Sequence, residues 1–144
     1  MVEQDTIKLL RECDAGIKMG VASIDEVLGH VTDPAFKKLL SDNKEAHEKL
    51  REELQTLLDR YHDDGKEPNP MAKGMSWIKS NVMMSMDGSD ATVADLITDG
   101  CNMGVKSLSR YLNQYAAADE KSKDVAKRLI AMEEQLAVDL RGYL

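Results

Sequence analysis

Apolar residues recur at steps of three and four positions along four long stretches of the chain. In the first stretch, about residues 6–30, the positions on this spacing are Ile7, Leu10, Cys13, Ile17, Gly20, Ile24, Val27 and Val31. Steps of three and four place these positions on one face of an α-helix. Similar stripes follow at about 34–62, 90–115 and 120–143. The pattern predicts an all-α protein in which four long helices form an antiparallel bundle.

Capping residues mark the starts of two of these helices. Asp33 stands directly before Pro34. The Asp33 side chain can accept hydrogen bonds from the free N–H groups of the first turn. A proline at the first helical position costs no hydrogen bond, because an N–H group there would have no partner within the helix. Asp119 can cap the last long helix in the same way.

A long segment, residues 63–89, separates the second long helix from the third. Prolines near the start of this segment exclude a helix there. A capping residue followed directly by a proline then predicts a short helix over 70–86. A helix of ~25 residues is ~38 Å long, and this segment is long enough to span that distance. It can therefore lead back to the other end of the bundle, so that the third helix runs parallel to the second. The predicted organisation is one domain, 1–144, with hairpins at 6–62 and 90–144.

The two halves of the chain resemble each other. At a shift of 84 residues, Gly16, Met19, Gly20, Val21 and Ser23 fall on Gly100, Met103, Gly104, Val105 and Ser107. At a shift of 90 residues, Lys37, Leu39, Leu50, Arg51 and Leu54 fall on Lys127, Leu129, Leu140, Arg141 and Leu144. Leu and Lys coincidences are common in amphipathic helices, whereas a repeated MGVxS is not. We therefore interpret the chain as a duplicated helical hairpin.

A duplicated helical hairpin joined by a long crossover resembles the ferritin-like superfamily, and the chain looks closest to small bacterial ferritin-like bundles of unknown function. The likeness lies in architecture more than in motif. In metal-binding members, two of the helices each contribute a Glu and the other two each contribute a Glu-x-x-His motif. All of these side chains point inward at two metal ions. Here Lys44 replaces the Glu before His47, and Ala137 replaces the His after Glu134. The resemblance therefore implies the fold, and not oxidase or iron-storage activity.

His47 lies on the apolar stripe of the second helix. The interpretation that we favour is a core histidine satisfied by a neighbour such as Asn43 or Glu133, because burying His and Glu unpaired costs several kcal/mol. The alternative is a reduced iron site made of His47, Glu133 and Glu134.

Four glycines lie in the middle of the first and third long helices: Gly16, Gly20, Gly100 and Gly104. Each costs ~1 kcal/mol relative to alanine in a helix interior, so the two GxxxG pairs need a reason. The explanation that we favour is a close approach of these two helices, with Gly20 facing Gly104. The alternative is a pocket for a small apolar ligand in the bundle core.

Composition and motifs narrow the functional classes. The net charge is −7 and no basic block is present, which argues against binding to nucleic acid or an anionic membrane. No apolar stretch approaches the ~18 residues of a membrane span, and the first dozen residues lack a signal-peptide core, so a cytoplasmic location follows by default.

Cys13 and Cys101 form no CxxC motif, which predicts neither a disulfide nor a zinc site. No phosphate loop, GxSxG or HExxH is present, so the sequence favours a protein that is not an enzyme and has no cofactor.

The predicted short helix carries an apolar stripe of its own. Its residues are Met71, Met75, Ile78, Val82 and Met86. Methionine-rich surfaces adapt to different partners, so this stripe either covers the flank of the bundle or forms an interface. The function that we expect is that of a non-catalytic bundle acting through contacts with an unknown protein partner or with copies of itself, as a homo-oligomer.

If the stripe is an interface, Ile78→Asp should release monomers that keep full helicity, because a carboxylate buried at an interface is costly. Sedimentation velocity gives the oligomer size, and circular dichroism gives the helicity. The fluorescence of Trp77, the single tryptophan, reports on this segment. An unchanged oligomer size would reject the interface, and a loss of helicity would assign the stripe to the flank of the bundle.

Overall fold

A computed structural model of the protein describes residues 2–66 and 89–144. In this part of the chain the elements are α1 (Val2–Leu28), α2 (Pro34–Asp59), α4 (Asp90–Gln114) and α5 (Glu120–Asp139), followed by a 3-10 turn, η1 (Leu140–Tyr143). The four long helices predicted from the apolar stripes are confirmed. The short helix predicted over 70–86, with its apolar stripe, lies outside the described residues.

The end of α2 differs from the prediction. The helix ends at Asp59 rather than near His62. His62 takes a positive φ of 55°, and the N–H of Asp63 bonds to the carbonyl of Leu58 at 3.1 Å. A left-handed residue followed by this backward hydrogen bond closes the last turn of a helix, so the helix stops before His62.

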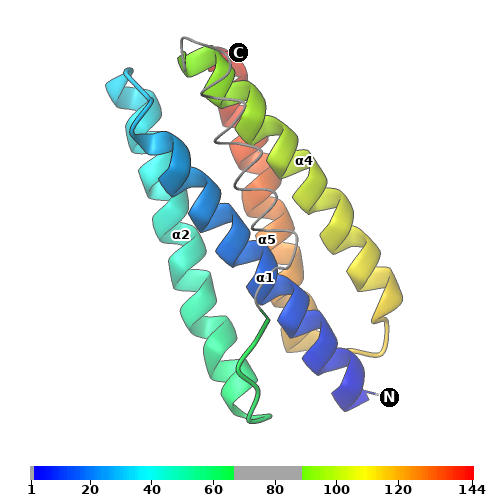
Figure 1. The fold of residues 1–144 in the computed structure, drawn as a ribbon. Coiled ribbons are helices and arrows are strands. Elements are labelled where there is room, and N and C mark those ends of the chain that lie inside the picture. The colour runs from blue at the N-terminus through cyan, green and yellow to red at the C-terminus, as the bar shows by residue number, and fades with distance from the viewer. Residues whose placement is uncertain (1, 67–88) are drawn as a thin grey trace.

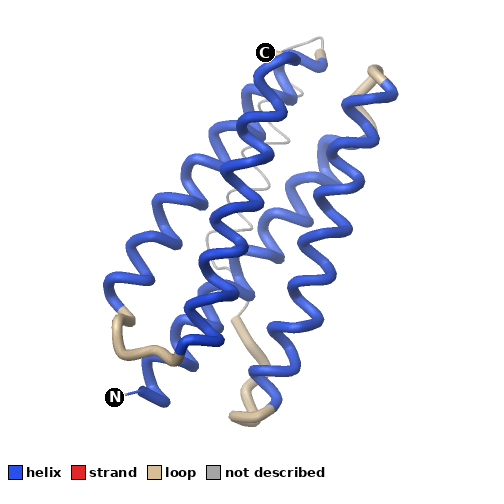
Figure 2. Tube along the Cα trace, turned by 180° about the vertical axis from the view of Figure 1, so that it is seen from behind, coloured by secondary structure: helices blue, strands red, loops and turns tan. Residues whose placement is uncertain are grey.

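The helices form two antiparallel hairpins, one from α1 and α2 and one from α4 and α5 (Figure 1). In the view of Figure 1, α1 and α5 run upward along the chain, whereas α2 and α4 run downward. The lower end of α2 and the upper end of α4 lie at opposite ends of the bundle, as Figure 2 also shows from behind. A long crossover therefore joins the two hairpins, as the length of segment 63–89 predicted.

The apolar core consists of two clusters, one toward each end of the bundle. The upper cluster, at the top of Figure 1, contains Ile24, Val27, Val31, Phe36, Leu40, Val93, Ala94, Leu96, Ile97, Cys101, Leu136 and Leu140. The lower cluster contains Leu9, Leu10, Cys13, Ile17, Leu50, Leu54, Leu58, Leu108, Ala118, Val125, Ala126 and Leu129. Full burial of one large apolar side chain contributes roughly 1.5–3 kcal/mol, so these clusters are the main force that holds the helices together.

The two cysteines belong to different clusters, Cys13 to the lower and Cys101 to the upper. Both are free thiols, as the absence of a CxxC motif predicted. Burial raises the pKa of each thiol to about 12. Both thiols therefore stay protonated near neutral pH, where a protonated thiol is a poor nucleophile and a poor metal ligand.

Each hairpin is tied to the other through the residue that caps its second helix. Asp33 caps α2, as predicted, and its own N–H donates to Asp90 Oδ2 at 2.9 Å near the start of α4. Asp119 caps α5, also as predicted, and its own N–H donates to Thr6 Oγ1 at 2.9 Å near the start of α1. Two equivalent contacts therefore fix the hairpins against each other at the two ends of the bundle.

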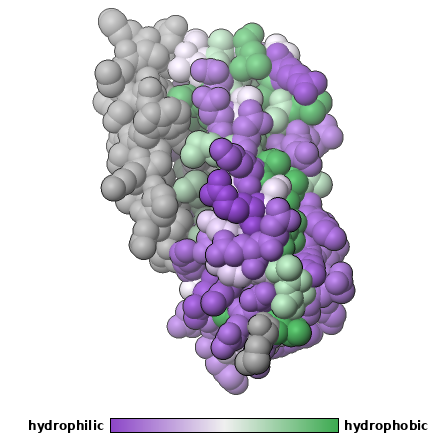
Figure 3. Space-filling view, turned by 90° about the vertical axis from the view of Figure 1, so that its right-hand side faces the viewer, coloured by the Kyte–Doolittle hydropathy of each residue, from purple (hydrophilic) through white to green (hydrophobic). Residues whose placement is uncertain are grey.

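The surface of the described part is that of amphipathic helices with their apolar faces turned inward. On the side that Figure 3 shows, hydrophilic residues cover most of the described surface, with hydrophobic residues visible between them. Among the described helices, none combines the length and the apolar composition that crossing a lipid bilayer requires.

Asp90 gives a test of the contact between the hairpins. Hydrogen bonds from the backbone N–H groups of Thr32 and Asp33 hold the pKa of the Asp90 carboxyl below its usual range. Because the pKa is lower in the folded state, the stabilisation is present above the unfolded value of about 3.9 and is lost as pH falls through the folded value. Asp90→Asn should therefore lower the melting temperature at pH 7, and the difference from the unmodified protein should shrink below about pH 4.

The matched control is Asp95→Asn, which changes an exposed carboxylate on the same helix and should have little effect at any pH. Melting curves recorded by circular dichroism from pH 3 to 7 check both variants. A deficit for Asp90→Asn that is equally large at pH 3 would show that the carboxylate charge is not what ties the loop to α4.

Candidate functional site at the middle of the bundle

One residue from each long helix forms a layer between the two apolar clusters. These residues are Gly20 of α1, His47 of α2, Gly104 of α4 and Glu133 of α5, and we refer to them as the middle layer. On every helix the flanking members of the upper and lower clusters lie on either side of this residue. His47 is only 2% exposed and Glu133 only 8%, so the layer places two ionisable groups inside the bundle.

The imidazole of His47 lies between a backbone carbonyl and a carboxylate. Its Nδ1 is 2.9 Å from the carbonyl oxygen of Asn43, one turn earlier in α2. Its Nε2 is 3.6 Å from Glu133 Oε1 and makes no hydrogen bond. His47 thus contacts both of the neighbours suggested by the sequence, although it meets Asn43 through the main chain rather than the side chain.

These contacts determine which imidazole nitrogen carries a hydrogen. A carbonyl oxygen can only accept, so the Nδ1 of His47 must donate to it. In a neutral imidazole, Nε2 would then present a lone pair to the carboxylate of Glu133, and two acceptors would face each other out of contact with water. A positive charge, either a proton on Nε2 or a cation held by both groups, turns this contact into an attraction.

The two glycines of the middle layer make room for this pair. A Cβ at Gly104 would overlap the carboxylate of Glu133, and a Cβ at Gly20 would lie 3.2 Å from both Cδ2 and Nε2 of His47. We predicted that these glycines allow two helix backbones to approach. In the structure the atoms nearest to each added methyl group belong to side chains of α2 and α5, so the close approach of the two backbones stays a prediction. The space is filled by the pair, so it is not an open pocket for an apolar ligand.

The other two glycines of the predicted GxxxG pairs differ from those of the middle layer. A Cβ at Gly16 would make one ordinary contact, at 3.7 Å, with Leu129 of the lower cluster. At Gly100 an added Cβ would meet no heavy atom of the described residues within 4 Å. The repeated sequence motif therefore does not correspond to one repeated packing role.

Glu134 is not part of the candidate site. It is exposed, whereas the adjacent Glu133 is buried, because successive helical residues point about 100° apart. Within the described residues, no group of three or more His, Cys, Asp or Glu side chains converges in a way that could hold a metal ion. The three candidate ligands from the sequence are thus reduced to the two that meet, His47 and Glu133.

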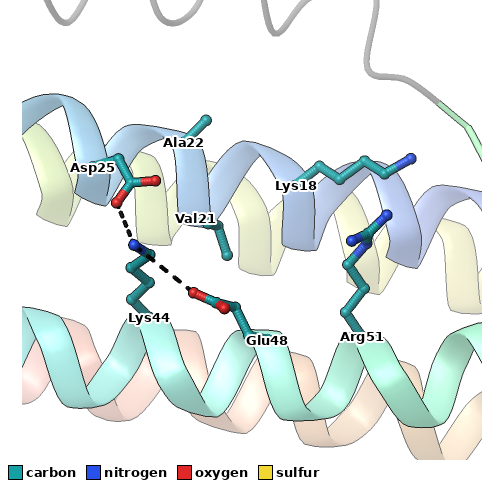
Figure 4. A pocket seen from close by; sticks show the side chains of 7 residues that line it. All are labelled: Lys18, Val21, Ala22, Asp25, Lys44, Glu48 and Arg51. Carbon is teal, nitrogen blue, oxygen red and sulfur yellow. Dashed lines mark ion pairs between the residues drawn. The ribbon is translucent and has the colours of Figure 1, made fainter.

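Lys44, which replaces the motif's Glu, lies outside the bundle core. It lines a shallow groove between α1 and α2 together with Lys18, Val21, Ala22, Asp25, Glu48 and Arg51 (Figure 4). Its Nζ is 2.6 Å from Asp25 of α1 and 3.9 Å from Glu48 of its own helix. Exposed ion pairs contribute at most about 1 kcal/mol, so Lys44 joins the two helices at the surface and does not take part in the middle layer.

A second buried carboxylate is Asp14 of α1. It is 0% exposed, accepts from the backbone N–H of Lys66 at 3.1 Å and pairs with Lys18 at 2.8 Å. Gly65 passes so close, with a φ of +86°, that a Cβ there would overlap the Asp14 carboxylate. Asp14 therefore fixes the chain where it leaves α2, and its role is structural.

Comparisons of the chain with protein-family models, with curated proteins and with solved structures give no match. The class that the coordinates establish is an all-α four-helix bundle with a long crossover.

The glycines of α4 give a matched pair of variants. Gly100→Ala should raise the free energy of unfolding by up to about 1 kcal/mol, because alanine favours a helix and the methyl group meets no described atom. Gly104→Ala should give no gain or a loss, because the methyl group pushes the Glu133 carboxylate away from His47. Urea unfolding at pH 7 measures both, and Gly100→Ala should be the more stable variant by about 1 kcal/mol. Equal gains at both positions would contradict the role assigned to Gly104.

Proposed function

We propose that the protein is a non-catalytic bundle of the ferritin-like type that acts through contacts with other protein chains, most simply as a homo-oligomer. The directions of the helices support the ferritin-like assignment, because two antiparallel hairpins joined by a long crossover are the arrangement expected for that group. The remaining support comes from the contacts between the hairpins and from the residues of the middle layer.

The contacts between the hairpins favour an origin by duplication. The 84-residue shift that superposes the glycine motifs also brings Thr6 onto Asp90. Thr6 accepts the N–H of Asp119, the cap of α5, and Asp90 accepts the N–H of Asp33, the cap of α2. Two positions related by the sequence repeat therefore make the same contact with the opposite hairpin, which is the relation that a duplicated hairpin would produce.

The observation that carries the non-catalytic assignment is the composition of the middle layer. The two-metal centre of metal-binding ferritin-like proteins uses four carboxylates and two histidines. In the middle layer one histidine and one carboxylate meet, and glycines occupy the facing positions on α1 and α4. The residues present do not fit a two-metal centre, which supports a protein without a redox step that acts through its surface contacts.

The test is the metal content and assembly state of protein purified without chelators from cells grown with added iron. We expect fewer than two iron ions per chain, no oxidation of added Fe²⁺ above the rate in buffer, and an oligomer larger than one chain by sedimentation velocity. His47→Gln is the control, because any oxidation that survives this substitution arises outside the middle layer. The proposal would be overturned by about two iron ions per chain together with Fe²⁺ oxidation that His47→Gln abolishes. A protein that is monomeric at all concentrations would rule out the homo-oligomer.

A further inference from the structure

We infer that the outward face of α4 binds the same face of a second copy of the chain, with the two helices antiparallel and a twofold axis between Asn102 and Met103. The inference rests on the proposed function, because it names the surface through which the homo-oligomer would form. It is carried by the order of the charges on this face and by the exposed apolar residue at its centre.

The outward face of α4 carries a single stripe of exposed residues. α4 packs against α1 and α5 and lies at the edge of the bundle (Figure 1). Steps of three and four positions place five exposed residues on one side of this helix. They are Asp95, Asp99, Met103, Lys106 and Arg110, and we refer to them as the α4 stripe. The buried residues Ile97, Cys101 and Leu108 lie on the opposite side of the same helix, so the stripe points away from the core.

The charges of the α4 stripe are ordered so that the stripe is complementary to itself. Its N-terminal half is acidic, with Asp95 and Asp99, and its C-terminal half is basic, with Lys106 and Arg110. Asp99 and Lys106 each stand three positions from the nearer residue beside the proposed axis, and Asp95 and Arg110 each stand seven positions from it. In an antiparallel pair related by this axis, each aspartate therefore lies opposite a basic residue of the other copy. A parallel pair would place like charges opposite each other.

The centre of the α4 stripe is apolar. Met103 is 67% exposed, more than any other large apolar residue that the structure describes. The others that are exposed, Val2, Val138 and Leu144, lie close to one end of the chain or the other. In the antiparallel pair each Met103 would lie beside Asn102 of the other copy. Its flexible side chain adapts to a partner surface, and its removal from water favours association.

The charges of the α4 stripe differ from those on the exposed faces of α2 and α5. On α2, Lys38 pairs with Asp42 at 2.7 Å, and on α5, Arg128 pairs with Asp124 at 2.9 Å, each one turn apart. On α4 the stripe residues four positions apart carry like charges, which destabilises a helix. In the part of the chain that the structure describes, no charge of the stripe forms an ion pair. Opposite charges from a second copy would replace this repulsion with attraction.

Neither the helix dipole nor the sequence repeat accounts for the α4 stripe. The dipole favours acids at the start of a helix and bases at its end, but its effect fades within one turn. Asp99 and Lys106 lie more than two turns from the nearer end of α4. At the positions that the 84-residue shift relates to these two residues, α1 has Ala15 and Ala22. The charges are therefore specific to the outward face of α4.

The test reverses the charges of one half of the α4 stripe at a time. Asp95→Lys with Asp99→Lys makes the stripe wholly basic, and Lys106→Glu with Arg110→Glu makes it wholly acidic. In each variant alone, like charges face each other, which should raise the dissociation constant of the dimer by at least about a hundredfold. An equimolar mixture of the two variants should recover a dimer with one chain of each. Sedimentation velocity at low ionic strength measures all of these states.

The matched control is Glu52→Lys with Glu134→Lys. It makes the same change in net charge as the basic variant at exposed positions of α2 and α5, and it should leave the assembly unchanged. Circular dichroism checks that every variant keeps its helices.

A second measurement uses the unmodified protein and does not depend on whether any variant folds. A carbodiimide joins a carboxylate directly to an amine, so it should link Asp99 of one chain to Lys106 of another. Peptides that combine an isotope-labelled and an unlabelled chain, identified by mass spectrometry, show that the link is between chains.

Three results would overturn the inference. The first is an oligomer that persists in both stripe variants, or one that the control disrupts equally; the proposed homo-oligomer would then stand on another surface. The second is a mixture of fully helical stripe variants that stays monomeric, or the absence of the Asp99–Lys106 link in an oligomeric unmodified protein. The third is an unmodified protein that is monomeric at all concentrations, which would also rule out the proposed homo-oligomer. The iron measurements that test the non-catalytic assignment are independent of all three.

Discussion

A histidine and a glutamate buried together halfway along a four-helix bundle constrain every helix around them. Both groups have lost most of their water, and a buried polar or charged group that lacks a partner costs several kcal/mol. The pair must therefore be kept in register between α2 and α5. It must also be given space on its other sides, which is where Gly20 and Gly104 lie. The division of the apolar core into two clusters follows from the same layer, because no apolar side chain occupies it.

Local features of the sequence were sufficient to predict most of the fold. The apolar stripes identified four helices, and Asp33 and Asp119 marked the starts of α2 and α5, because helical periodicity and capping depend on residues only a few positions apart. The end of α2 was misplaced because a left-handed residue at His62 has no reliable sequence signal when the residue is not glycine or asparagine. The crossover was predicted from length alone, since a short loop cannot join two parallel helices.

The candidate site was only partly predictable, because it depends on how the helices are rotated against one another. The apolar stripe of the second helix placed His47 inward, as the structure shows, whereas the sequence offered both Glu133 and Glu134 as its partners. Only Glu133 faces inward, because the next residue of a helix points about 100° away. The glycines were recognised as costly, but the sequence could not show that the neighbours they accommodate come from α2 and α5. The contact of Asp14 with the chain at Gly65 was missed for the same reason, because it joins residues that are 51 positions apart.

The proposed duplication explains why the middle layer holds one histidine and one carboxylate. At the 90-residue shift, His47 corresponds to Ala137 and Asn43 corresponds to Glu133, so each half of the chain supplies one member of the pair and an uncharged residue at the other position. Two identical hairpins would supply both members twice or not at all, and four buried ionisable groups would have to be compensated together. Two hairpins in one chain can diverge independently. Divergence can therefore leave one histidine facing one carboxylate, a combination in which an imidazolium would cancel the charge of the carboxylate.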